Sequence, residues 1–62
     1  MEDRKVAVVT GGSGDIGRAI CLEFARQGYA IAFTYMRSYE SARQLERELR
    51  DVGVPVLSAK AQ

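Results

Sequence analysis

Four glycines fall within the seven residues from Gly11 to Gly17, directly after a short apolar run at residues 6–9. The run is rich in valine, which favours a strand buried on both faces. Gly12, Gly14 and Gly17 follow the spacing G-x-G-x-x-G. Between a buried strand and a helix, this spacing is typical of a loop that binds a dinucleotide pyrophosphate, because bare backbone can approach the anion closely.

The residues after the loop predict a helix and a second strand. Ile16, Ile20 and Phe24 recur every four residues, which indicates an amphipathic helix with these side chains on its inner face. We expect this helix to stop at Gly28, which can adopt the left-handed conformation of a helix end. Residues 29–35 are aromatic and aliphatic and predict the second strand.

A second helix and a third strand complete the pattern. Ser38 can cap the helix, Glu40 suits the positive end of its dipole, and Gly53 ends it. Residues 54–59 predict the third strand, with Pro55 at its start because proline lacks a donor for the sheet. The order β-α-β-α-β predicts a parallel sheet of strand order 3-2-1. Residues 1–62 are therefore interpreted as the amino-terminal dinucleotide-binding half of a doubly wound α/β (Rossmann) domain.

Composition excludes several classes of site. The 62 residues carry a net charge of +1, no histidine and one cysteine, so nothing indicates a metal site, an internal disulfide or a partner nucleic acid. Cys21 is interpreted as a small apolar helix residue. No apolar run approaches the roughly 20 residues that span a bilayer. The mixed charges of residues 1–5 do not resemble a signal peptide, so we expect a cytoplasmic protein.

The second strand's end is where a dinucleotide site selects its cofactor. NAD sites usually carry an acidic residue there, bonded to the ribose 2′-hydroxyl. Residues 33–38 contain no acid, and Arg37 can instead meet a 2′-phosphate, with Ser38 and Thr34 as weaker partners. We therefore expect NADP rather than NAD. The alternative for Arg37 is an ordinary solvated surface arginine.

Asp15 is the one residue of the loop that does not suit an anion. The helix dipole favours a carboxylate in the first turn, but the same carboxylate would repel a phosphate if it pointed into the loop. We interpret it as a first-turn residue that points away. A Walker phosphate loop is excluded, because no Gly-Lys-Ser/Thr sequence closes the motif.

Residues 6–20, VAVVTGGSGDIGRAI, resemble the opening of the short-chain dehydrogenase/reductase family. The similarity continues through residues 25–30, and Tyr35 with residues 42–49 is most similar to the 3-oxoacyl-acyl-carrier-protein reductases. The larger branch of the family has T-G-x-x-x-G-x-G, in which Asp15 replaces the middle glycine. The extended branch, which includes sugar-nucleotide epimerases, has T-G-x-x-G-x-x-G, which Gly14 satisfies. We give more weight to the longer segment, Tyr35 with residues 42–49, and so expect a member that is similar to the reductases. The extended branch remains an alternative.

The resemblance implies hydride transfer between NADP(H) and a carbonyl or alcohol substrate. It also implies a set of cofactor-binding residues: Gly11, Ser13, Gly14, Asp15, Ile16, Gly17, Arg37 and Ser38. In it, Ser13 would lie near the adenosine ribose and the Ile16 N–H would face the pyrophosphate.

The family's catalytic serine and Tyr-x-x-x-Lys pair have no counterpart in these residues, so no catalytic residue is assigned and the 62-residue chain alone should be inactive. Tyr29, Tyr35 and Tyr39 lack a lysine four residues on. We expect a piece of an oxidoreductase that is a homo-oligomer when complete. A non-catalytic nucleotide-binding or regulatory module is the other alternative. We expect the isolated chain to fold poorly or to associate through its first strand, whose apolar edge lacks a neighbour.

Overall fold

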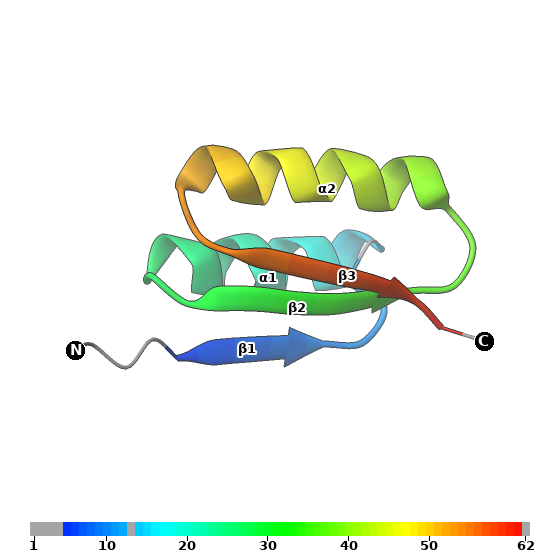
Figure 1. Ribbon diagram of the computed structural model, residues 1–62. Coiled ribbons are helices and arrows are strands. Elements are labelled where there is room, and N and C mark those ends of the chain that lie inside the picture. The colour runs from blue at the N-terminus through cyan, green and yellow to red at the C-terminus, as the bar shows by residue number, and fades with distance from the viewer. Residues whose placement is uncertain (1–4, 13, 62) are drawn as a thin grey trace.

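The computed structural model describes residues 5–12 and 14–61, which form three parallel strands and two helices (Figure 1). In chain order the elements are β1 (Val6–Val9), α1 (Asp15–Arg26), β2 (Ala30–Tyr35), α2 (Tyr39–Val52) and β3 (Val56–Lys60). The sheet order is β1-β2-β3, and both pairs of strands are parallel. This arrangement confirms the predicted half of a doubly wound sheet.

Both helices cover the same face of the sheet, as Figure 1 shows. The core lies between the two layers and is centred on β2, whose alternate residues Ile31, Phe33 and Tyr35 point toward the helices and are buried. The helices supply the other side of the core, with Cys21 and Ala25 from α1 and Ala42, Leu45 and Leu49 from α2. Burial raises the pKa of the Cys21 thiol, in agreement with its interpretation as a packing residue.

The opposite face of the sheet is uncovered in the described chain. Val8 of β1 is 73% exposed and Leu57 of β3 is 71% exposed. The prediction that residues 6–9 are buried on both faces is therefore wrong for these residues. Residues 5–12 and 14–61 provide helices on one face of the sheet only. Continuously apolar strands such as residues 6–9 are typical of parallel sheets that are covered by helices on both faces.

The inner face of α1 also differs from the prediction. Cys21 and Ala25 are the fully buried residues of this helix, whereas Ile16 is 78% exposed and Ile20 is 41% exposed. Phe24 and Ile20 instead line an apolar groove beside β1. The apolar stripe of α1 is wider than the surface with which its neighbours cover it, so only the part that joins the core cluster with β2 and α2 is fully buried.

The ends of the second helix follow the predicted signals. The Ser41 N–H donates to the Ser38 hydroxyl at 3.2 Å, and Gly53 ends the helix with a left-handed φ of 105°. Helix α1 ends at Arg26, and Gly28 turns the chain two residues later with a φ of 92°. Neither helix in the described part of the chain is long and apolar enough to cross a membrane.

Candidate functional site

The predicted cofactor residues that the structure describes lie at the carboxyl edge of the sheet. Strands β1 and β2 run in the same direction, so the loop after Val9 and the segment after Tyr35 leave the sheet at one edge (Figure 1). A hydrogen bond joins the two segments directly, because the Gly12 N–H donates to the Thr34 carbonyl oxygen at 2.9 Å. In doubly wound sheets, this edge is where ligands bind.

The loop is folded tightly against the first turn of α1. Gly11 has a φ of 71°, which side chains rarely adopt, and its carbonyl oxygen accepts from the Gly14 N–H at 3.2 Å. A Cβ on Gly17 would lie 2.3 Å from the Gly11 oxygen. A Cβ on Gly12 would lie 2.6 Å from the Cβ of Phe33. The loop can therefore pack between β2 and α1 only with glycine at positions 12 and 17.

The amino terminus of α1 has backbone donors that no described residue accepts. Its N-cap is Gly14, which has no side chain to bond the first turn. The first helical bond is from the Arg18 N–H to the Gly14 carbonyl oxygen at 2.7 Å, so the N–H groups of Asp15, Ile16 and Gly17 have no partner within the helix. No acceptor for them occurs among residues 5–12 and 14–61.

This terminus fits a pyrophosphate. Three N–H groups without an acceptor in the described part of the chain, together with the positive end of a 12-residue helix, favour an anion. Gly14 also leaves the approach open, since even an added Cβ would meet only the Gly11 oxygen, at 3.6 Å. Asp15 is exposed in the first turn, where its carboxylate interacts favourably with the helix dipole. Ser13, the residue expected near the ribose, lies outside the described residues.

Arg37 and Ser38 leave β2 at this edge and differ in availability. The Ser38 hydroxyl accepts from the Ser41 N–H and donates to the Ser41 hydroxyl at 2.9 Å, so its bonds are directed to the cap of α2. Arg37 is exposed, and it forms no salt bridge within the described part of the chain. Of these two predicted residues, Arg37 is thus the one whose side chain has no partner in the described part of the chain.

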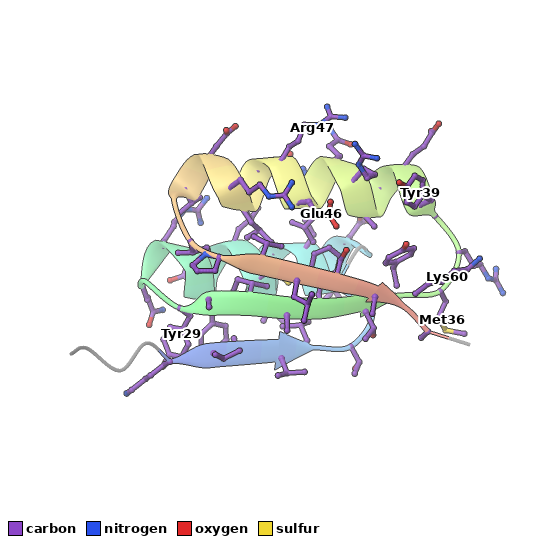
Figure 2. The ribbon with its side chains drawn as sticks, viewed as in Figure 1. Tyr29, Met36, Tyr39, Glu46, Arg47 and Lys60 are labelled. Atoms are coloured by element: carbon purple, nitrogen blue, oxygen red, sulfur yellow. The ribbon has the colours of Figure 1, made fainter. Side chains whose placement is uncertain are left out.

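The structure brings a second cation to the same edge that the sequence analysis did not single out. Lys60 ends β3 and pairs with Tyr35 in the parallel register, and the Ala61 N–H donates to the Tyr35 carbonyl oxygen at 2.7 Å. Lys60 therefore ends its strand at the edge where Met36 and Arg37 leave β2, and Figure 2 labels Lys60 and Met36 at this end of the sheet. No local pattern in the sequence reveals this placement, because it depends on the parallel register of β2 and β3.

The three tyrosines have packing partners. Tyr29 lies edge-on to Phe24 with ring centroids 4.9 Å apart, and Tyr35 is buried under the helices. The Tyr39 hydroxyl accepts from Arg43 at 2.8 Å, and the guanidinium of Arg43 lies over the same ring. Each tyrosine thus packs against or bonds to a neighbouring side chain, in agreement with its interpretation as a strand or helix residue.

Comparison with known proteins identifies the family of this chain. The sequence model of the short chain dehydrogenases matches residues 5–62. A glucose and ribitol dehydrogenase homolog from Oryza sativa subsp. japonica is 52% identical over 50 residues, which are 77% of this chain and 17% of the rice protein. A 3-oxoacyl-acyl-carrier-protein reductase from Staphylococcus aureus is 39% identical over 61 residues, which are 98% of this chain and 25% of that protein.

A solved structure agrees with both sequence comparisons. The crystal structure of a metagenomic short-chain oxidoreductase in complex with NADP superposes with a TM-score of 0.83 at 36% identity, over 94% of this chain and 26% of that one. This chain spans a quarter or less of the length of the two curated relatives described in the preceding paragraph. Those relatives carry different activities in their names, so the likeness identifies the family and no single branch of it. With β1, the glycine loop and α1 in place, the chain is the nucleotide-binding amino-terminal region of a member of the short-chain dehydrogenase/reductase family.

Proposed function

We propose that this chain is the NADP(H)-binding portion of an oxidoreductase that transfers hydride between NADP(H) and a carbonyl or alcohol substrate. The observation that carries the choice of cofactor is Arg37, an exposed cation without a salt bridge among the described residues, at the end of β2. An acid at this place would bond a ribose 2′-hydroxyl, whereas an arginine favours a 2′-phosphate.

The residues of this chain would bind and orient the cofactor. The free N–H groups of Asp15, Ile16 and Gly17 would hold the pyrophosphate at the amino terminus of α1. Arg37 would contact the 2′-phosphate, and the N-terminal end of α2 beside it would add a favourable dipole. The bound cofactor supplies or accepts the hydride.

The relatives support an oxidoreductase over the extended branch. The two curated relatives described above are named as a dehydrogenase homolog and a reductase, and the metagenomic structure contains NADP. The spacing of Gly14 and Gly17 is the one feature that favours an epimerase-like member. We assign the substrate only as a carbonyl or alcohol. Its turnover would depend on a serine and a Tyr-x-x-x-Lys pair in the whole protein, which we propose to be a cytoplasmic homo-oligomer.

Arg37→Glu in the whole protein tests the proposal. Because a carboxylate would face the 2′-phosphate, we expect the Kd for NADPH to rise at least tenfold, from the roughly 1.5–3 kcal/mol of a charge-assisted bond. The Kd for NADH should change far less. Calorimetry or nicotinamide fluorescence measures both.

Arg47→Glu is the matched control. Arg47 is exposed in the middle of α2, so the substitution changes the net charge equally without reaching the edge of the sheet (Figure 2). If the ratio of the two Kd values is the same in Arg37→Glu and in the parent protein, Arg37 does not select the cofactor. If the parent protein binds neither nucleotide, the proposed function is wrong.

A further inference from the structure

Thr34 is bonded to the glycine loop at two consecutive amides. The Gly12 N–H donates to the Thr34 carbonyl oxygen at 2.9 Å, and the Gly11 N–H donates to the Thr34 hydroxyl oxygen at 3.3 Å. The first bond involves only backbone and would form with any residue at position 34. The second bond requires a hydroxyl, so it depends on the identity of Thr34.

The bond to Gly11 acts on the part of the loop that positions the helix. Gly11 has a left-handed φ, and its carbonyl oxygen accepts from Gly14, the N-cap of α1. The same oxygen lies against Gly17, where a Cβ would come within 2.3 Å of it. The Gly11 N–H belongs to the peptide group that precedes Gly11, whereas the Gly11 carbonyl oxygen shares the next peptide group with the Gly12 N–H. The two bonds to Thr34 thus hold the two peptide groups on either side of Gly11, and together they hold its left-handed conformation. A change in this conformation would displace the Gly11 oxygen from both the N-cap and the first turn of α1.

We infer that Thr34 is a positioning residue: its hydroxyl holds the peptide group that precedes Gly11, and so keeps Gly11 in the conformation that places the pyrophosphate-binding N–H groups of α1. This inference rests on the proposed function. The Gly11 N–H is directed to Thr34 and not to the anion. Holding the loop in its binding conformation before the cofactor arrives lowers the cost of ordering it on binding.

The test compares Thr34→Val with Thr34→Ser in the whole protein. Valine has nearly the shape of threonine but no hydroxyl, and serine keeps the hydroxyl. We expect Thr34→Val to raise the Kd for NADPH at least threefold, because it removes one hydrogen bond that holds the loop. Thr34→Ser should stay within about twofold of the parent protein, because it restores the acceptor for Gly11.

Adenosine 2′-monophosphate separates positioning from direct contact. This ligand carries the 2′-phosphate and no pyrophosphate, so its Kd should be the same in the parent protein and in Thr34→Val. Equal weakening of adenosine 2′-monophosphate and NADPH would mean that Thr34 contacts the 2′-phosphate itself, which would overturn the inference. Equal Kd values for NADPH in Thr34→Val and the parent protein would overturn it as well.

Further measurements distinguish a failure of this inference from a loss of protein stability and from a failure of the proposed function. Melting temperatures of the variants show whether each is folded, and Thr34→Cys replaces Thr34→Val if valine prevents folding. A serine variant as weak as the valine variant would show that shape and not the hydroxyl matters, against the inference. Absence of NADPH binding by the parent protein would instead refute the proposed function.

Discussion

The four glycines of the loop have different reasons to be glycine. Gly11 needs a left-handed φ, and Gly12 and Gly17 are in such close contact with Phe33 and Gly11 that a Cβ has no room. Gly14 has an extended conformation and open space beside it. The fold therefore requires three of these glycines and leaves the fourth free to vary.

Gly17→Ala should destabilise the protein much more than Gly14→Ser. The added Cβ at position 17 would overlap the Gly11 oxygen, and overpacking of this kind costs about 1–3 kcal/mol. Serine at position 14 fits, and as an N-cap it should leave stability within about 0.5 kcal/mol of the parent protein or raise it slightly. Chemical denaturation of the whole protein with each substitution measures the difference. Equal destabilisation by the two variants would contradict the packing described for Gly17.

The residues of the candidate site were predictable from the sequence where the backbone provides the chemistry. The G-x-G-x-x-G spacing places free N–H groups at a helix start whatever the surrounding side chains are. Lys60 was not identified, and Thr34 was named only as a weaker partner for a 2′-phosphate and not for its bond to the loop. Their positions depend on the register of β3 and on one hydrogen bond to Gly11, and both are tertiary relations that no local pattern contains.

Among the elements, helix α2 links the fold to the candidate site through its first residues. Ser38 caps the helix, and Arg37 precedes it directly. A substitution at Ser38 can therefore change the stability of α2 and the binding of the cofactor by different mechanisms.

Ser38→Ala and Ser38→Asp should separate these two effects. Alanine removes the acceptor for the Ser41 N–H, which should cost about 1 kcal/mol of stability. Aspartate restores the acceptor and suits the positive end of the helix, so stability should return to within a few tenths of a kcal/mol. Its charge should nevertheless weaken NADPH binding in the whole protein. Thermal melting and NADPH titration of both variants measure this, and an aspartate variant that binds NADPH as tightly as the parent would place the 2′-phosphate away from Ser38.

The elements themselves were predicted closely, but the buried faces of β1 and α1 were not. Strong local signals mark the element ends, as at Ser38 and Gly53. The buried side of α1 depends instead on its neighbours. Ile16 and Ile20 have the helical spacing of core residues, yet Cys21 and Ala25 are the residues that face α2 and β2. Periodicity shows that a helix has an apolar stripe, and it does not show how much of that stripe the neighbouring elements cover.

At the scale of the whole molecule, the described chain is a two-layer structure with apolar surface left on the open face and edge of its sheet. Val6, Val8 and Leu57 are exposed on the open face, and the groove between β1 and α1 is lined by Ile20 and Phe24. The outer edge of β1 has no strand beside it in the described residues. Unpaired strand edges next to apolar surface promote association.

We therefore expect the isolated 62-residue chain to associate in solution. Sedimentation velocity over a range of concentrations should show species larger than the monomer, and Val8→Lys should shift the distribution toward the monomer, because it places a charge on the open face of the edge strand. Val52→Lys is the control, since Val52 is an exposed residue in the last turn of α2, away from β1, where a cation suits the helix dipole. A chain that stays monomeric at every concentration and unfolds in one cooperative thermal transition would show that the helix layer alone stabilises the sheet. Equal effects of the two lysine substitutions would show that association does not depend on β1.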